Sequence, residues 1–385
     1  MRTGWNVINR LTGKQIPLLV GSFVLGNVGT GTMSVAWTMD TVGPAVVSVG
    51  PVTPDPRNTP VNSVDVLFSE QIDPATFDWL DLELKHNGTV VGGLDAVTIT
   101  QVSSSLFRIS GLGGLTTDEG IYQLTVKVTE VSDLAGNAGT IAGNGSDTWT
   151  MDTTAPQVVR VFEIDPDPRN TAVDEVNVEF SEPIDLATFD WQDLALRRDG
   201  LPMSLNDTVT ISHVAGGVYS ISGLAPFTAL EGSYELTVSG AGIEDEAGNA
   251  ATGSAADQWL MDLTPPEVLE VIEVAPDPRS TAVETVDVVF SEPINVSSFG
   301  LAAIELTHEG TALDLSHGTI TFEHVSGYTY RISGLAAFTA AEGTYVLTVF
   351  GAELADEAGN AGVGSASDQW HVDLTPPEVL DVIDV

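Results

Sequence analysis

Hydrophobic and polar residues alternate in short segments along most of this chain. In one such segment, Val176, Val178 and Phe180 face one side, whereas Asn177 and Glu179 face the other. A period of two residues is typical of a half-buried β-strand, and no segment keeps a helical period over three turns. Because these segments recur at intervals of about 10–15 residues, they predict antiparallel β-sandwiches with about seven strands each.

One short motif divides the chain into repeats. It reads Asp-Leu-Thr-Pro-Pro-Glu-Val at 262–268, and near or degraded copies begin at Asp40, Asp152 and Asp373, so that the four Asp residues lie 112, 110 and 111 residues apart. Proline fixes φ and favours an extended conformation in the residue before it, so the motif predicts a stiff linker that leads into a strand. The linkers separate three units: unit 1 (41–152), unit 2 (153–262) and unit 3 (263–373).

The two ends of the sequence have patterns of their own. Residues 26–40 match 248–262 in length and in their first and last landmarks, so we expect residues 1–40 to be the remnant of a preceding repeat. The alternative is a degenerate leader, a signal peptide cleaved after the small residues at 34–36. Residues 374–385 predict the first strand of a truncated fourth repeat, which suggests that both ends are cut from a longer array.

The amino-acid composition excludes several classes of function. The net charge is −41, from 54 acidic and 13 basic residues, and Cys is absent. Such a charge repels nucleic acid and anionic membranes and attracts cations. Without Cys there is no disulfide framework, and a hydrophobic content of 43% distinguishes the chain from disordered acidic proteins. No segment predicts membrane insertion, because the apolar run at 16–25 is too short to span a bilayer.

Further motifs recur in the same order in each unit. Unit 2 contains Phe-Ser-Glu-Pro-Ile-Asp at 180–185, Thr188-Phe189, Glu-Gly-Ser-Tyr at 231–234 and Asp-Glu-Ala-Gly-Asn at 245–249. The whole unit resembles the bacterial Ig-like domains of surface-layer proteins and large repetitive adhesins, and Glu-Gly-x-Tyr resembles the immunoglobulin tyrosine corner. The resemblance implies an all-β tandem array of Ig-like sandwiches. It also implies a structural stalk or spacer in a large bacterial extracellular or cell-surface protein, whose partners are neighbouring repeats and, in an adhesin, host or biofilm surface ligands.

Acidic residues should converge at one end of each unit. In Ig-like connectivity the incoming linker, the B–C loop and the F–G loop lie at the same pole, so their polar residues approach one another. The candidates in unit 1 are Asp40, Glu70, Asp73, Asp133 and Asn137. Those in unit 2 are Asp152, Glu182, Asp185, Asp245 and Asn249. Those in unit 3 are Asp262, Glu292, Asn295, Asp356 and Asn360.

These oxygen-rich sets predict a calcium ion at each joint. Ca²⁺ takes six to eight oxygen ligands, which carboxylates, amides and main-chain carbonyls supply, and an ion there would stiffen the joint as in cadherin-type arrays. Two alternatives remain open. Asp-x-Ala-Gly-Asn also suits a plain turn, and the acidity also suits solubility or adaptation to salt. The Pro-Asp-Pro-Arg loops, through Asp55, Asp165, Asp167 and Asp277, are expected to approach the next joint.

Other residue types carry less functional information. Trp149, Trp259 and Trp370 occupy matching positions and are expected in the core, whereas an exposed Trp would suit sugar stacking in a carbohydrate-binding module. No catalytic motif is present, and the acidic pairs recur in all three units, although a catalytic pair would normally occur once in a cleft. We therefore do not expect an enzyme. An accessory role beside the catalytic domain of a larger secreted enzyme remains a further alternative.

Overall fold

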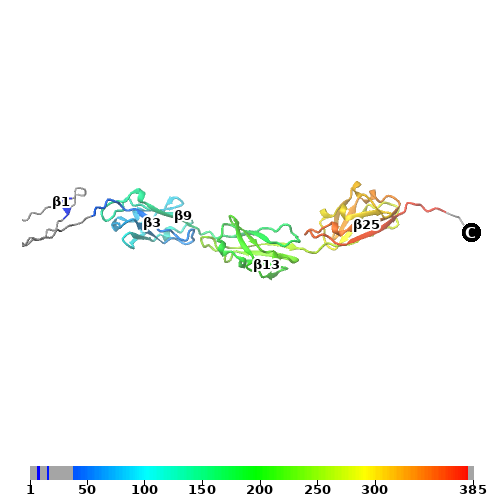
Figure 1. Ribbon diagram of the computed structural model, residues 1–385, viewed down its shortest axis with the longest axis horizontal. Coiled ribbons are helices and arrows are strands. Elements are labelled where there is room, and N and C mark those ends of the chain that lie inside the picture. The colour runs from blue at the N-terminus through cyan, green and yellow to red at the C-terminus, as the bar shows by residue number, and fades with distance from the viewer. Residues whose placement is uncertain (1–6, 9–14, 17–37, 380–385) are drawn as a thin grey trace, which may run out of the picture.

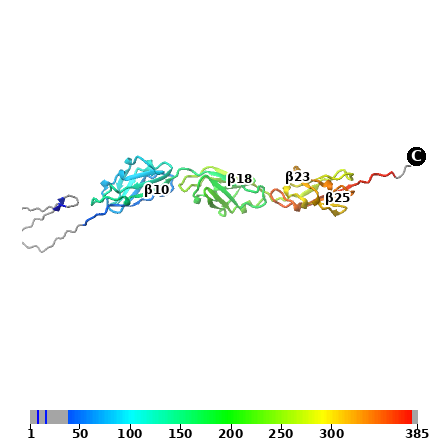
Figure 2. The ribbon, with the colours of Figure 1, turned by 90° about the horizontal axis from the view of Figure 1, so that it is seen from above.

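The three units fold as separate β-sandwiches that follow one another end to end in an elongated array (Figure 1, Figure 2). The computed structural model describes residues 7–8, 15–16 and 38–379. Most of the predicted remnant or leader at 1–40 lies outside the described residues, and so does the end of the predicted fourth repeat. In the described parts, β1 (Val7–Ile8) pairs with β2 (Gln15–Ile16), and residues 374–379 form no strand.

Each unit contains two four-stranded antiparallel sheets, which confirms the predicted fold class. In unit 2 the sheet orders are β11-β12-β16-β15 and β14-β13-β17-β18. These orders correspond to strands A-B-E-D and C′-C-F-G of an Ig-like sandwich. The strands of unit 2 are β11 (Val158–Val161), β12 (Glu175–Phe180), β13 (Leu194–Arg198), β14 (Leu201–Met203), β15 (Thr210–Ala215), β16 (Val218–Ser222), β17 (Gly232–Ser239) and β18 (Ser254–Met261).

Units 1 and 3 repeat this arrangement strand by strand. Unit 1 has β3 (Val46–Val49), β4 (Ser63–Phe68), β5 (Leu82–His86), β6 (Thr89–Val90), β7 (Thr98–Gln101), β8 (Leu106–Ser110), β9 (Gly120–Val126) and β10 (Gly145–Met151). Unit 3 has β19 (Val268–Val271), β20 (Thr285–Phe290), β21 (Ile304–His308), β22 (Thr311–Ala312), β23 (Thr321–Ser326), β24 (Thr329–Ser333), β25 (Gly343–Phe350) and β26 (Ser365–Val372).

The strand count exceeds the expected seven by one short edge strand in each unit. Asn87, Asp199 and Glu309 take φ of 49°, 50° and 50°, and each is followed by a glycine with positive φ. This two-residue turn reverses the chain immediately, so the next two or three residues pair back onto strand C as β6, β14 or β22.

Helical structure is confined to single turns among the described residues. There is one α-helix, α1 (Ala225–Thr228), and none of these helices is long and apolar enough to cross a membrane. The 3-10 helices are η1 (Pro74–Thr76), η2 (Trp79–Asp81), η3 (Leu94–Ala96), η4 (Gly113–Leu115), η5 (Ile141–Gly143), η6 (Leu186–Thr188), η7 (Trp191–Asp193), η8 (Val296–Ser298), η9 (Leu301–Ala303), η10 (Leu315–His317), η11 (Leu335–Ala337) and η12 (Gly351–Glu353).

Each sandwich has its own hydrophobic core, which includes a few aromatic side chains. Trp149, Trp259 and Trp370 are buried as predicted, and Trp259 stacks on Tyr234 with ring centroids 5.4 Å apart. The Tyr234 hydroxyl donates a 2.8 Å hydrogen bond to the carbonyl of Leu230, four residues upstream. This bond is the tyrosine corner, and it fixes the turn into strand F. Unit 3 has the equivalent bond from Tyr345 to the carbonyl of Ala341, whereas in unit 1 the Tyr122 hydroxyl accepts a hydrogen bond from the main-chain N–H of Asp118.

Candidate metal centres

Three acidic side chains meet at the pole where each unit begins. In unit 2, Asp152 lies in the incoming linker, Glu182 follows β12 in the B–C loop, and Asp245 lies in the F–G turn between β17 and β18. Carboxylate oxygens of the three residues lie within 4.8 Å of one another. The connectivity that places these loops at one pole therefore does bring together residues that are up to 93 positions apart in the sequence.

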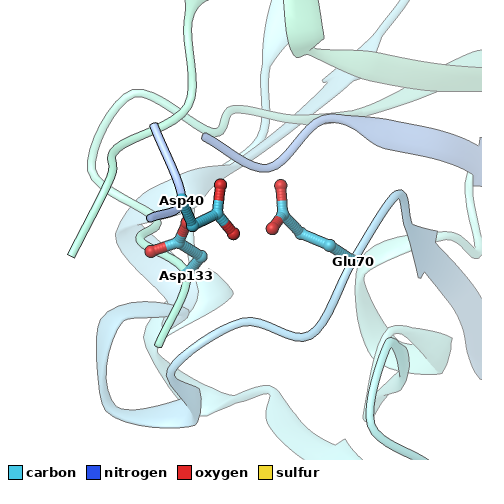
Figure 3. Close-up of side chains that lie close together, drawn as sticks. All are labelled: Asp40, Glu70 and Asp133. Atoms are coloured by element: carbon cyan, nitrogen blue, oxygen red, sulfur yellow. The ribbon is translucent and has the colours of Figure 1, made fainter. Parts of the chain in front are cut away.

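The same group occurs in the other two units. Asp40, Glu70 and Asp133 form it in unit 1, and Figure 3 shows the carboxylates of Asp40 and Glu70 facing one another, with that of Asp133 beside Asp40. Asp262, Glu292 and Asp356 form it in unit 3. In every group the first-named Asp comes from the linker and the last-named is buried. We call these three sets the pole groups.

The F–G turn is organised by its own acidic residue. The Oδ1 atom of Asp245 accepts hydrogen bonds from the main-chain N–H groups of Ala247 and Asn249, and Gly248 has a φ of +88°. These bonds are those expected of a plain Asx-type turn. They occupy both lone pairs of Oδ1, but Oδ2 keeps a free lone pair even after its bond from Asn249 Nδ2, so the turn and a ligand role are compatible.

The Asn residue of this turn donates hydrogen bonds from its side-chain amide to members of the pole group. Asn249 Nδ2 donates to Asp245 Oδ2 at 2.8 Å and to the carbonyl of Asp152 at 3.0 Å. Asn360 makes the corresponding bonds to Asp356 and Asp262, whereas Asn137 bonds to Asp133. The Asn residues therefore position the carboxylates that surround the candidate site.

Two predicted ligands, and the candidate Asn that replaces them in unit 3, have a different role. Asp73, Asp185 and Asn295 are N-caps of η1, η6 and η8, and each accepts a hydrogen bond from the main-chain N–H two residues later. A side chain used in this way satisfies a donor at the start of a helical turn. The structure does not bring these three residues into the pole groups.

Electrostatics at the pole groups are unfavourable without a counter-charge. Burial raises the pKa of Glu182, and the neighbouring Asp152, Asp245 and Glu119 raise it further. The pKa of Glu292 is raised by burial and then by Asp262, Asp356 and Glu231. Burial and then Asp40 and Asp133 likewise raise the pKa of Glu70. Each glutamate is thus held near like charges in a partly desolvated place.

Two buried oxygen atoms in these groups have no hydrogen-bond partner. The Oε1 atoms of Glu182 and Glu292 are fully buried and unsatisfied. A buried charged oxygen without a partner costs free energy, and in native proteins such an atom usually faces a donor or a cation. The donor set is made only of oxygen atoms, which suits Ca²⁺.

Each of these two joints also receives an acidic residue from the preceding unit, which the sequence pattern did not predict. Glu119 of unit 1 lies close enough to raise the pKa of Glu182, and it accepts hydrogen bonds from Thr153 and Thr154 in the linker. Glu231 has the same relation to Glu292 and Thr264 at the next joint. Glu119 and Glu231 are each the first residue of a Glu-Gly-x-Tyr motif. Their recurrence was visible in the sequence, but their approach to the following unit was not.

A cavity lies at the second of these joints. Its volume is about 510 Å³, and residues of unit 2, including Asp199 and Glu231, line it together with Asp262 and Glu292. Acidic side chains from two consecutive units thus line one cavity. Its acidic side chains attract cations.

The Pro-Asp-Pro-Arg loops do reach the end of their own unit, beside the next joint. Asp55, Asp167 and Asp277 each accept a hydrogen bond from a main-chain N–H of the last strand, at Thr150, Leu260 and His371. Asp55 and its equivalents thereby fasten the A–B loop to strand G. They are outside the pole groups.

The chain is similar in part to several known proteins. Among solved structures, the chain is similar to an I-band fragment from titin, with 13% identity, coverage of 88% of this chain and 100% of that one, and a TM-score of 0.28. It is also similar to the N-terminal part of the bacterial S-layer protein SbsC, with 15% identity, coverage of 57% and 44%, and a TM-score of 0.20. No curated protein matches the sequence. The sequence model described as bacterial Ig-like domain matches residues 152–259, so unit 2, flanked by two repeats of the same fold, is a bacterial Ig-like domain.

Proposed function

We propose that this chain is a stalk segment of a larger bacterial cell-surface or secreted protein, and that calcium ions stiffen its joints. The observation that carries the proposal is the pole group, which recurs at the start of three consecutive sandwiches. A spacer needs the same joint many times, whereas a catalytic centre is normally built once. The repetition therefore favours a mechanical role over catalysis.

The geometry of the pole groups suits calcium. Two oxygens bound to one Ca²⁺ at 2.3–2.6 Å lie at most about 5 Å apart. The oxygens of each pole group lie within 4.8 Å of one another, which meets this limit. Carboxylates supply three or more of the six to eight ligands, and a main-chain carbonyl or water supplies the rest. The bound ion would offset the repulsion among three negative charges and give the buried Oε1 of Glu182 a partner.

Bound calcium would act mechanically because its ligands belong to different parts of the joint. Asp152 is in the linker, whereas Glu182 and Asp245 belong to the body of unit 2. An ion held by all three residues fixes the linker against the sandwich. The result is a rod that holds a distal part of the parent protein away from the cell, and that part would supply any adhesive function.

The test compares melting and small-angle scattering of the chain in calcium and in chelator. A ligand at 100 times its Kd stabilises the folded state by about 2.7 kcal/mol, so we expect chelation to lower the melting temperature by on the order of 10 °C. Chelation should also change the small-angle scattering curve, because the rod becomes more flexible at its joints. Glu182→Gln should reduce the calcium response, whereas Glu246→Gln, an exposed acid in the same unit outside the pole group, should not. Identical curves in calcium and chelator would refute the metal.

One observation favours a second candidate, carbohydrate binding by unit 1. Trp79 is 42% exposed and its neighbour Leu80 is 66% exposed, whereas Trp191 in unit 2 packs partly against the core and unit 3 has Leu301 at this position. An exposed indole offers a flat apolar face for a sugar ring. A glycan array with the parent chain and Trp79→Ala tests this candidate, which requires hits that the variant loses.

A further inference from the structure

One hydrogen bond joins unit 1 directly to unit 2, outside the linker and the pole group. Asn58 Nδ2 donates to the carbonyl of Gly248 at 2.7 Å, between residues 190 positions apart. Asn58 follows Pro-Asp-Pro-Arg in the A–B loop at the far end of unit 1. Gly248 lies in the F–G turn of unit 2, between Asp245 and Asn249. The contact therefore links the body of one sandwich to the body of the next.

The second joint brings the equivalent residues close together, although among the described residues the hydrogen bond itself occurs only at the first joint. Asn170 occupies the position of Asn58 in unit 2, and Gly359 that of Gly248 in unit 3. A β-carbon built on Gly359 would lie 3.6 Å from Asn170 Nδ2, and one built on Gly248 would lie 3.4 Å from Asn58 Nδ2. Both glycines have positive φ, +88° and +91°. Two joints with different linker sequences thus bring the same pair of residue types together.

The loop that carries Asn58 is held firmly at the joint. Arg57 N–H donates to the carbonyl of Thr150 at 3.0 Å, and Asp152 N–H donates to the carbonyl of Arg57 at 2.8 Å. The Arg57 guanidinium bonds to Thr59, which closes the loop. Asn58 is half-buried and is already ordered by its own unit, so a bond to the next unit costs little further entropy.

A second contact restrains the same joint from another strand. Thr154 in the linker donates to Glu119 Oε2 at 2.7 Å, and Thr264 donates to Glu231 at 3.0 Å. Glu119 precedes strand F of unit 1, whereas Asn58 is in its A–B loop. One contact holds the linker and the other holds the following sandwich.

We propose that Asn58 and Asn170 are inter-unit latches, which fix the orientation of each sandwich relative to the next without any cation. The surface involved is the A–B loop of one unit, and its partner is the F–G turn of the following unit. Because a single hydrogen bond is modest, the latch shifts the population toward one orientation. This inference is independent of the calcium proposal, since neither Asn belongs to a pole group.

Distances between spin labels test the latches in the full chain. The protein contains no Cys, so introduced pairs are specific: Thr100→Cys with Ser212→Cys spans the first joint, and Ser212→Cys with Glu323→Cys spans the second. All three positions are exposed strand residues. In chelator, Asn58→Ala should broaden the distance distribution across the first joint, and Asn170→Ala should broaden it across the second. Asn58→Asp, which keeps the size but cannot donate, should act like Asn58→Ala.

Each variant also serves as the control for the other. Asn58→Ala should leave the second joint unchanged, and Asn170→Ala should leave the first unchanged. Unaltered distributions at the matching joint, or equal broadening at both joints from either variant, would overturn the proposal. All measurements are made in chelator, so failure of the calcium proposal does not affect them. A calcium response with no effect of either variant would refute the latches alone.

Discussion

Asn249 Nδ2 lies 3.0 Å from the main-chain carbonyl of Asp152, and this hydrogen bond joins the F–G turn of unit 2 to the linker that enters it. The same Nδ2 bonds to the side chain of Asp245. One amide group therefore holds two of the three members of the pole group at their positions. The equivalent Asn360 does the same in unit 3.

Asn249→Ala should destabilise unit 2. The substitution removes one hydrogen bond to a carboxylate and one to a carbonyl, a loss of about 1–3 kcal/mol for a partly buried site. Urea denaturation followed by the fluorescence of unit 2 measures the change. Asn137→Ala is the matched control in unit 1, because Asn137 bonds to Asp133 and the described residues show no second bond from its amide to the linker. We expect a smaller loss there, and an equal loss would contradict the bridging role.

The sandwiches themselves were predictable from local pattern. Alternation in segments such as 176–180 identifies strands, and the recurrence of Glu-Gly-x-Tyr fixes where strand F begins. The pole groups were predictable from strand connectivity. An Ig-like sandwich places the B–C loop, which holds Glu182, and the F–G loop, which holds Asp245, at the same pole. Asp73 and Asp185 were assigned to the same place because they are near Glu70 and Glu182 in sequence. Their side chains instead turn back to cap a 3-10 helix, a local preference that spacing alone does not reveal.

Contacts between units could not be predicted in the same way. Glu119 and Asn58 act across a joint, so their partners depend on how one sandwich is rotated relative to the next. That rotation is set by a few side-chain bonds, such as Asn58 to Gly248, and produces no periodicity in the sequence. Recurrence showed that these residues belong to the repeat, but only three-dimensional placement shows what they contact.

Acidification should stabilise the calcium-free protein between about pH 7 and 5. Burial and neighbouring carboxylates raise the pKa of Glu182 above its ordinary value of 4.5, and the pKa of Glu292 is raised in the same way. The folded state then binds a proton more tightly than the unfolded state, so stability increases as pH falls toward 4.5 and is lost again as pH rises through the folded pKa. Melting curves in chelator at several pH values measure this.

Calcium should reverse that pH dependence. The ion requires ionised carboxylates, so protons and calcium compete, and acid should lower the melting temperature when calcium is present. Groups with lowered pKa, such as Asp65 bonded to Arg108, lose their contribution only at lower pH and do not mask the effect. A melting temperature that falls from pH 7 to 5 in chelator would contradict the raised pKa values of these glutamates.

Glu182→Gln should have opposite effects with and without calcium. Without the ion, it removes a like charge from the pole group, so unit 2 should melt at a higher temperature. With the ion, it removes a charged ligand, and calcium affinity should fall on the order of 10–100-fold, the range found when metal-site partners are removed. Calorimetric titration and melting of the same samples measure both. Glu292→Gln should repeat the result in unit 3, and equal destabilisation in both conditions would indicate a purely structural glutamate.

Tyr234→Phe tests the tyrosine corner, which places Glu231 at the joint. The Tyr234 hydroxyl bonds to the carbonyl of Leu230 at 2.8 Å, and its ring is fully buried against Trp259. Phe retains the ring packing but removes the bond, so unit 2 should lose about 0.5–1.5 kcal/mol in the free energy of unfolding. Tyr328→Phe, at a side chain that is 50% exposed, should leave stability unchanged within about 0.5 kcal/mol. Urea denaturation of both variants measures the difference, and equal stabilities would show that packing alone holds the corner.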